Sequence, residues 1–314
     1  MIPLLEVKDL KKYFPARKGF ALKGQGFVKA LDGISFSLGS AQTFSIVGES
    51  GCGKTTLAKI ILKLIRPDSG SVIFQGRDIT KISQNQFRPY RRDIQIIFQD
   101  PYSSLDPRFT VRRVLVEAEE AVGQKSQEQD LDKILQTVGL TKDIKNRFSF
   151  EFSGGQCQRI SIARVLIVMP KLLILDEPVS ALDVSLQARI LELLEDLQDK
   201  LGISYLFISH NLRIVRKISD IIMVMYLGKI LEMGAAQQVY NMPLNPYTQA
   251  LISASTDKKI ILKGEIASNI NVPSGCRFHT RCLYAKDICR EKEPPLAETE
   301  KGHFSACHFA TNFL

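Results

Sequence analysis

The sequence predicts an α/β fold with a largely parallel β-sheet, an antiparallel β edge and a helical insertion. Short apolar runs of strand length recur along the chain, and segments with helical apolar spacing lie between them. Strands that alternate with helices favour a parallel sheet, because each helix carries the chain back to the edge where the previous strand began. The composition also changes near residue 256, where periodicity weakens and cysteines accumulate.

The first elements of the core follow from their apolar patterns. Residues 30–36 alternate as a half-buried strand does, and residues 43–47 form the continuous apolar run of a buried strand. A glycine-rich turn and a helix over 55–65 come next, and the turn at 67–70 ends that helix. Another strand is expected at 71–74.

The helical insertion is predicted from the middle of the chain. A short apolar strand at 94–98 precedes a charged stretch over 111–140 whose apolar residues have helical spacing. A polar break at 124–130 divides this stretch. We therefore expect a helical subdomain at about residues 100–163, inserted into the α/β core.

The last core elements lead to a proposed domain boundary. Buried strands at 172–175 and 204–209 lie on either side of a helix over 184–201. A chain of 314 residues allows two or three domains. We expect one nucleotide-binding domain over 1–255 and a small, loop-rich, Cys-rich module over 256–314.

The overall composition is that of a folded globular protein. Hydrophobic residues make up 45% and charged residues 24% of the chain, which argues against disorder. No apolar run reaches the roughly 18 residues of a membrane-spanning helix, and the first residues lack the features of a secretory signal. The net charge of +9 suggests either an anionic partner or a solvated basic face.

Residues 48–56 form a G-x-x-x-x-G-K-T phosphate-binding loop (P-loop) between a predicted strand and a predicted helix. Its glycines let backbone N–H groups turn toward phosphate oxygens, and the helix N-terminus adds a positive dipole end. Lys54 is expected to reach the β- and γ-phosphates of a nucleotide, and the Thr55 hydroxyl is expected to bind Mg²⁺. The predicted nucleotide-binding residues of this loop are Gly48, Glu49, Ser50, Gly51, Cys52, Gly53, Lys54, Thr55 and Thr56.

Cys52 lies inside this loop, where a nearby helix N-terminus can lower the pKa of a thiol. Two interpretations are open. Cys52 is either a small residue that fills its position or an accessible thiol that bound nucleotide would protect from a maleimide.

The predicted strand at 172–175 ends in two carboxylates, Asp176 and Glu177. At the carboxyl edge of a sheet, Asp176 is expected to complete the Mg²⁺ shell through water. Glu177 is expected to polarise the attacking water. Because strands often end in acidic residues, the pair alone is a weak indication of a catalytic site, and the presence of a P-loop in the same chain makes it a strong one.

A second anion site is predicted where Phe152-Ser153-Gly154-Gly155-Gln156 opens a helix. Ser153 is also a good N-cap residue, so an ordinary helix cap is the alternative. Two phosphate cradles for one nucleotide suggest that this one serves a nucleotide held by another subunit. The residues predicted to do so are Ser153, Gly154, Gly155 and Gln156.

Taken together, these motifs resemble the ATP-binding cassette (ABC) family in order and spacing, with the second anion site as the family's signature. The resemblance implies three further roles. Asp183 ends the D-loop, His210 is the switch histidine that contacts the γ-phosphate, and Gln99 lies in the Q-loop, where it touches metal and water and hinges the helical insertion. The implied Mg²⁺ ligands are Thr55, Gln99 and Asp176.

The resemblance also implies an aromatic side chain that stacks on adenine. Tyr13 fits this role, and the chain has no tryptophan to compete with it. Phe14 and Phe20 are rivals, and simple core packing of Tyr13 is the alternative.

A narrower resemblance covers nearly the whole chain. The long Q-loop FQDPYSSLDPR, the extended segment at 11–29 and the tail at 245–282 resemble the ATPase subunits of bacterial dipeptide, oligopeptide and nickel importers. Two residues depart from the family's signature. Phe152 replaces a leucine, and Cys157 replaces a common arginine, which we expect to weaken a surface contact and to spare the phosphate-binding residues.

Four cysteines near the end of the chain have the spacing C-x5-C-x6-C-x17-C. This is looser than compact zinc motifs, and four thiolates suit a [4Fe–4S] cluster; members of the resembled family carry one in this tail. Zinc and unliganded thiols are the alternatives, with His279, His303 and His308 as substitute ligands. We predict a structural cluster whose loss leaves nucleotide binding by residues 1–255 largely intact, held by Cys276, Cys282, Cys289 and Cys307.

The resemblance implies an ATP-hydrolysing, energy-coupling subunit of a bacterial importer for di- or oligopeptides, or for nickel or another small solute. Its cofactors would be ATP, Mg²⁺ and the [4Fe–4S] cluster. Its partners would be a second ATPase subunit (identical or paralogous), two membrane permease subunits and, indirectly, an extracytoplasmic solute-binding protein, with no nucleic acid. It would be peripheral, on the cytoplasmic face of the inner membrane. A soluble non-transport ABC ATPase and a degenerate cassette are the other readings.

Overall fold

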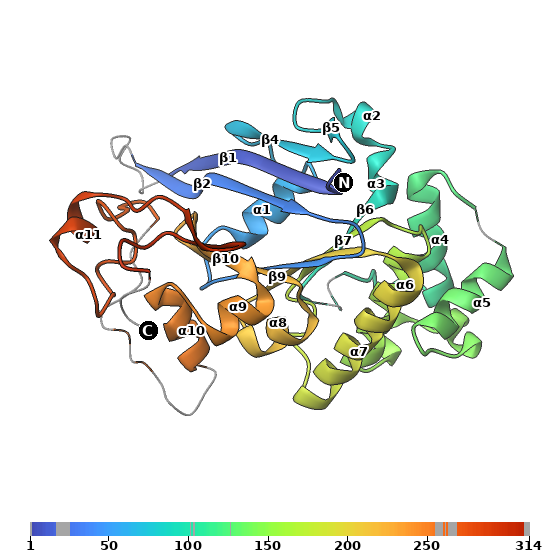
Figure 1. The fold of residues 1–314 in the computed structure, drawn as a ribbon. Coiled ribbons are helices and arrows are strands. Elements are labelled where there is room, and N and C mark those ends of the chain that lie inside the picture. Colours follow the sequence, from blue (N-terminus) through green and yellow to red (C-terminus); the bar gives the residue numbers. More distant parts are fainter. Residues whose placement is uncertain are drawn as a thin grey trace. The chain divides into compact units, whose positions relative to one another are not determined.

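The computed structural model describes residues 2–16, 26–100, 102, 104–125, 127–254, 260, 262 and 269–310. The chain divides into two compact units (Figure 1). Unit 1 comprises residues 1–39, 43–81 and 207–314, and unit 2 comprises residues 40–42 and 82–206. The domain boundary predicted at residue 255, the rival Phe20, and Pro101 and Ser103 of the Q-loop lie outside the described residues.

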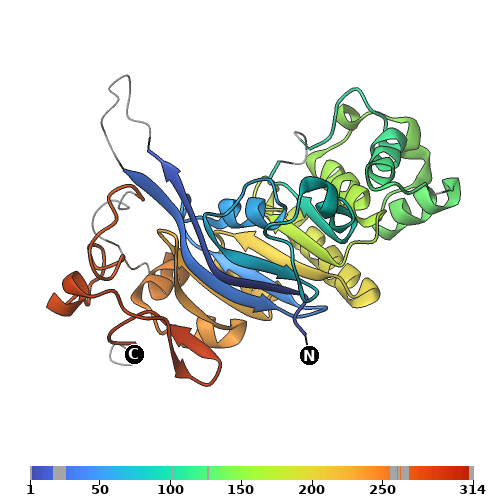
Figure 2. The same cartoon turned by 90° about the horizontal axis from the view of Figure 1, so that it is seen from above.

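Unit 1 contains the predicted antiparallel edge as a sheet of its own, in the order β2-β1-β4-β5. The long strands β1 (Leu5–Pro15) and β2 (Phe27–Leu38) pair antiparallel and run side by side in Figure 2. Strand β4 (Ser69–Phe74) pairs antiparallel with β1, and the short β5 (Arg77–Asp78) follows it. The alternation Leu5-Glu6-Val7 buries Leu5 and Val7 at the start of β1, as expected of a strand with one covered face.

The second sheet of unit 1 carries the P-loop. Strand β3 (Thr43–Val47) is buried throughout and pairs parallel with β9 (Ile221–Tyr226). Strand β9 pairs antiparallel with β10 (Lys229–Ala235), and β12 (His303–Ser305) and β11 (Ala297–Glu300) follow in that order. The sheet is therefore mixed rather than purely parallel.

Helices pack on strands of both sheets of unit 1. Helix α1 (Lys54–Ile61) contacts β2 of the first sheet, and α8 (Leu212–Ile218) contacts β3 of the second sheet (Figure 1). Helix α9 (Ala236–Asn241) packs on β10 and α8. Two more helices complete the unit, α10 (Pro246–Ala254) and α11 (Asp287–Glu291).

Unit 2 holds the remaining parallel strands and the helical insertion. Strand β6 (Ile94–Ile97) pairs parallel with β7 (Leu172–Asp176). The division between the units falls within β8 (Ser204–Ser209). The helices of unit 2 are α2 (Gln84–Phe87), α3 (Tyr90–Asp93), α4 (Val111–Val122), α5 (Glu128–Thr137), α6 (Gly154–Leu166) and α7 (Val184–Leu201), with 3₁₀ turns at Lys142–Asn146 and Ser149–Glu151.

Two sequence-based expectations differ from the structure. The helix expected over 55–65 ends at Ile61, because Lys63 adopts a left-handed φ of 57° that α-helix does not allow. The terminal segment is not a separate module, because β12 pairs with β10 and so extends the sheet of unit 1. Within the described residues, no helix has the length and apolar character needed to cross a membrane.

Candidate nucleotide-binding site

The P-loop of unit 1 joins the end of β3 to the start of α1. Gly53 has a φ of +115°, which favours glycine, and a Cβ there would lie 2.2 Å from the backbone oxygen of Ala30. A Cβ at Gly48 would lie 2.2 Å from the oxygen of Met225. Both glycines are therefore required by close backbone approach. At these two positions the loop packs so closely against β2 and β9 that a residue with a Cβ does not fit.

Lys54 is buried and folds back onto the loop. Its Nζ donates hydrogen bonds to the backbone oxygens of Gly48 (2.6 Å) and Glu49 (3.0 Å). Gly53 gives α1 no side-chain cap, so the first turn of the helix offers its N–H groups to an anion. Thr55 is exposed and Thr56 is half-buried in this first turn. The arrangement suits a phosphate, which would attract the ammonium group of Lys54.

Cys52 is a packing residue of the loop. Its side chain is 3% exposed, and burial raises the pKa of its thiol despite the nearby Lys54 ammonium. Burial therefore outweighs the positive charge near this thiol. Of the two interpretations, the structure favours a small residue that fills its position.

Tyr13 lies on β1, and its hydroxyl donates a hydrogen bond to the carboxylate of Asp32 on β2. Burial and this hydrogen bond raise the pKa of Tyr13 to about 12, so its ring is neutral at physiological pH. Asp32 is tied to the P-loop through Gly228, whose oxygen accepts from Asp32 N (2.9 Å) and whose N–H donates to Cys52 O (3.0 Å). The ring of Phe14, the other described candidate for stacking on adenine, lies under the ammonium group of Lys12.

Unit 1 also contains His210, the expected switch histidine. It directly follows β8 and is exposed, and the neighbouring Asn211 caps α8 by accepting from Arg213 N (3.0 Å). A strand end and a capped helix thus fix the backbone on both sides of His210.

Unit 2 holds the acidic pair at the end of β7. Asp176 is the last residue of the strand and is buried. Glu177 has a left-handed φ of 52°, and its oxygen accepts hydrogen bonds from the N (3.2 Å) and Oγ (3.0 Å) of Ser180. Gln99 lies two residues beyond β6 and is exposed. Because β6 and β7 run parallel, with Ile97 opposite Leu175, Gln99 and the acidic pair lie at the same edge of this strand pair.

The signature of unit 2 begins α6 with a capping box. Ser153 Oγ accepts from Gln156 N (3.4 Å), and Gln156 Oε1 accepts from Ser153 N (3.0 Å). Gly155 packs closely, because a Cβ there would lie 3.1 Å from Leu186 Cδ2. Asp183 is the N-cap of α7 and accepts from Leu186 N (2.9 Å). The signature and the D-loop are therefore linked through Leu186.

Cys157 differs from the expected surface position. Its side chain is fully buried, and its Sγ donates to the backbone oxygen of Ser149 (3.4 Å). A thiol fits this enclosed position, so the substitution alters the interior of the helical insertion rather than a surface contact.

The four terminal cysteines, Cys276, Cys282, Cys289 and Cys307, all line one small cavity of unit 1. Burial and the proximity of other cysteines raise the pKa values of Cys276 and Cys307 to about 11, so both thiols are protonated at neutral pH. Within the described part of the chain, no group of three or more His, Cys, Asp or Glu side chains is arranged so that it could hold a metal ion. The thiols thus converge on one cavity without forming the ligand set of a single ion.

The three histidines named as substitute ligands have other partners. His303 is fully buried and its Nε2 lies 2.7 Å from Glu232 Oε1. His279 and His308 line the cysteine cavity, but a ring nitrogen of each hydrogen-bonds a backbone oxygen, that of Cys276 and of Lys292 respectively.

Sequence reasoning missed two arginines that contact the candidate site. Arg281 forms an ion pair with Glu49 of the P-loop, and Arg277 forms one with Asp32. Both lie between Cys276 and Cys282, in a segment predicted to belong to another domain. The only signal in the sequence was that two arginines lie close to two cysteines. That signal did not indicate that Arg281 would pair with Glu49, which lies 232 residues away.

The strand, glycine loop and helix of unit 1 define a P-loop nucleotide-binding fold. Residues 31–180 match the family model of the ABC transporter, and residues 231–289 match that of the oligopeptide/dipeptide transporter C-terminal region. The chain is 46% identical to the oligopeptide transport ATP-binding protein AppF of Bacillus subtilis, over 97% of each chain. It is 43% identical to a probable peptide ABC transporter ATP-binding protein of Sinorhizobium fredii, over 97% of this chain and 89% of the relative.

Solved structures agree with this assignment. The structure of cbiO1 from Clostridium perfringens, part of the ABC transporter complex cbiONQ, superposes with a TM-score of 0.66 at 30% identity. The match covers 76% of this chain and 91% of that one. The protein therefore belongs to the family of ABC transporter ATP-binding proteins.

Proposed function

We propose that the chain is the ATP-hydrolysing, energy-coupling subunit of a bacterial importer for di- or oligopeptides. The observation that carries the proposal is the P-loop, whose glycines are required by backbone approach and whose Lys54 is buried among loop carbonyls. The cargo class is supported by relatives that match nearly the whole chain and are named as oligopeptide or peptide transport ATP-binding proteins. The alternative is an importer whose cargo is nickel or another small solute.

ATP would bind with its phosphates on the loop residues 48–56 and its adenine on Tyr13. Lys54 would neutralise the β- and γ-phosphates, and His210 would contact the γ-phosphate. Thr55, Gln99 and Asp176 would supply oxygen ligands of the kind that suits Mg²⁺, which would neutralise phosphate charge when bound. Glu177 would accept a proton from the attacking water as a general base.

The signature residues Ser153, Gly154, Gly155 and Gln156, together with Asp183, would complete the nucleotide site of a second ATPase subunit. A capped helix N-terminus with two glycines at its start can bind a partner's phosphate through backbone N–H groups. Closure of the two subunits would act on two permease subunits, which receive solute from an extracytoplasmic binding protein. The chain would thus work as a peripheral subunit at the cytoplasmic face of the inner membrane.

The test of this function is co-purification and transport with the tagged, full-length chain. We expect two membrane subunits and a second ATP-binding subunit to co-purify, and Lys54→Ala to abolish uptake of a labelled tripeptide. Lys59→Ala, an exposed lysine of the same helix, is the matched control. Uptake of labelled nickel instead of the tripeptide would identify nickel as the cargo. Co-purification with ribosomes or DNA alone would refute the importer function.

For the terminal cysteines, we propose a structural [4Fe–4S] cluster held by Cys276, Cys282, Cys289 and Cys307. All four side chains line one cavity, and all are free thiols. Zinc needs thiolates at about 2.3 Å from one ion, whereas a four-iron cluster occupies more space between its ligands. The shared cavity is the observation behind the proposal, and zinc remains the alternative metal.

Anaerobic purification tests the cluster. We expect brown protein with about four irons and four sulfides per chain and broad absorbance near 400 nm. Replacing any one of the four cysteines with serine should remove the colour. Colourless protein with stoichiometric zinc would show that the metal is wrong, and metal-free protein with an ordered tail would refute a metal site.

A further inference from the structure

The segment between Cys276 and Cys282 reaches the candidate nucleotide site at two places. Its two arginines, Arg277 and Arg281, are both buried although each carries a charge. Burying a guanidinium costs free energy unless it is paired and hydrogen-bonded. The partners of these two arginines therefore indicate what the segment does.

Arg281 holds the second residue of the P-loop. Its two terminal nitrogens donate to the two carboxylate oxygens of Glu49, at 2.7 and 3.1 Å, which is the two-point geometry that a guanidinium and a carboxylate form best. These hydrogen bonds raise the pKa of Arg281 above its ordinary value. Glu49 N also donates to the buried hydroxyl of Tyr247 (2.9 Å), and Lys54 Nζ donates to Glu49 O (3.0 Å). Glu49 is thus fixed from three directions, and one of them is the cysteine segment.

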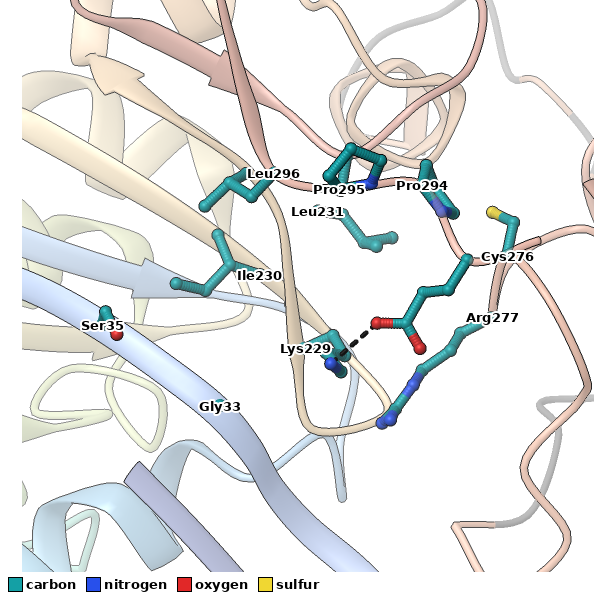
Figure 3. Close-up of a pocket in the computed structure, with 12 residues that line it drawn as sticks. Gly33, Ser35, Lys229, Ile230, Leu231, Cys276, Arg277, Pro294, Pro295 and Leu296 are labelled. Carbon is teal, nitrogen blue, oxygen red and sulfur yellow. Dashed lines mark ion pairs between the residues drawn. The ribbon is translucent and has the colours of Figure 1, made fainter. Parts of the chain in front are cut away.

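Arg277 holds the residues beneath the proposed adenine platform. It donates to Asp32, which accepts from Tyr13, and to the oxygen of Leu227 in the turn between β9 and β10. Burial would raise the pKa of Asp32, but the Tyr13 hydrogen bond and the Arg277 charge together keep it below its usual value. Figure 3 shows Arg277 on the wall of a cavity, close to the Lys229–Glu293 ion pair (2.7 Å).

The backbone of the segment is fixed to the other cysteines. Cys276 N donates to Cys289 O (2.8 Å). A Cβ at Gly275 would lie 2.4 Å from that same oxygen. Both ends of the segment carry a cysteine of the shared cavity. The two arginines and the thiols of Cys276 and Cys282 therefore share one short backbone segment.

We propose that residues 276–282 are a positioning segment for the nucleotide, in which Arg281 sets the P-loop through Glu49 and Arg277 sets Tyr13 through Asp32. The state of the cysteines then controls nucleotide affinity from outside the catalytic groups. The sequence-based expectation is the opposite, that nucleotide binding by residues 1–255 is independent of the tail, and the experiments below decide between the two. The proposal rests on the proposed nucleotide binding.

The test measures the dissociation constant of a fluorescent ATP analogue on the full-length chain. We expect Arg281→Ala to raise it about tenfold, within the usual range of coupling between sites, and to raise KM for ATP more than it lowers kcat. Arg290→Ala removes an exposed arginine of the same tail and should change neither value. An Arg281→Ala protein with wild-type affinity and KM would overturn the proposal.

A double-mutant cycle separates positioning from general loss of stability. If Arg281 acts through Glu49, Arg281→Ala should weaken binding in the wild-type background and have little effect in a Glu49→Ala background. Arg281→Lys keeps the charge but loses the two-point hydrogen bond, so its affinity should lie between those of the wild type and Arg281→Ala. This variant replaces Arg281→Ala in the test if the alanine variant does not fold. Equal losses in both backgrounds would refute the route through Glu49.

The role of the cysteines is tested with Cys282→Ser, which should bind the ATP analogue more weakly than the wild type, as Arg281→Ala should. Unchanged affinity in a folded Cys282→Ser protein would refute control by the cysteines. Wild-type protein that binds no ATP analogue would instead refute the proposed function, so the two failures are distinguishable.

Discussion

Glu177 combines a carboxylate with a backbone conformation that glutamate rarely adopts. Its φ of 52° is held by two hydrogen bonds from Ser180, and such strain is found most often at functional sites. We expect Glu177→Gln to keep ATP binding, to trap a closed dimer and to reduce hydrolysis roughly 10²-fold or more. Phosphate release and nucleotide binding are the measurements, with the exposed Glu192→Gln as control. Near-normal turnover would reject Glu177 as the general base.

Cys52 gives a second prediction at the residue scale. Because its thiol is buried and its pKa is raised, we expect slow labelling by a maleimide in the native protein, with or without Mg-ATP. Labelling should become fast in urea. Peptide mapping by mass spectrometry distinguishes Cys52 from the other five cysteines. Rapid native labelling that nucleotide suppresses would favour the accessible thiol instead.

The predictability of single residues depended on how local their signal was. Lys54, Thr55, Ser153 and Asp183 lie at helix starts whose motifs are complete within a few residues. The pairing of Arg281 with Glu49 joins residues 232 positions apart, and no local pattern encodes it. The motif left two interpretations of Cys52 open, because it does not reveal the burial that raises the pKa of this thiol despite nearby positive charge.

At the scale of elements, the turn between β9 and β10 supports the P-loop from outside its motif. Gly228 has a φ of +77°, and a Cβ there would lie 2.5 Å from Lys29 O. We expect Gly228→Ala to destabilise the protein by more than the roughly 1 kcal/mol that a left-handed alanine costs, and to weaken nucleotide binding. Urea unfolding and analogue binding are the measurements.

Gly202 provides the matched control for this prediction. It ends α7 with a φ of +65°, and a Cβ there would meet nothing within 4 Å. Gly202→Ala should therefore show only the conformational cost and leave nucleotide binding unchanged. Equal effects of the two substitutions would mean that the close approach of Gly228 to β2 does not matter.

Elements with a strong periodic pattern were predicted closely. The bounds of α7, β3 and β8 agree with the sequence-based ranges, because each is a continuous apolar or amphipathic run with clear ends. The strands of the second sheet's antiparallel side were not individually predicted. The pairing partners β9 and β12 are far apart in sequence from β3 and β10, so register there depends on tertiary contacts.

At the scale of the whole molecule, Glu232 joins three parts of unit 1. From β10, its carboxylate accepts from Leu244 N (2.8 Å) and Asn245 N (3.0 Å) and lies 2.7 Å from His303 Nε2 on β12. We expect Glu232→Ala to destabilise unit 1 by about 3–5 kcal/mol, because buried partners lose their acceptor. Circular dichroism during urea unfolding measures this, with the exposed Glu291→Ala as control. A change below about 1 kcal/mol would contradict it.

The division of the chain into units also sets an order of assembly during translation. Residues 82–206 are continuous and can fold as they leave the ribosome, whereas the P-loop strand must wait for β9 and the sheet edge at β10 must wait for β12. At roughly 5–20 residues per second, about 4–14 s pass between residue 235, where β10 ends, and residue 305, where β12 ends. During that interval β10 presents an unpaired edge, which favours association with other chains. Slow decoding of the last hundred codons would therefore be expected to increase aggregation of this protein more than slow decoding of its middle.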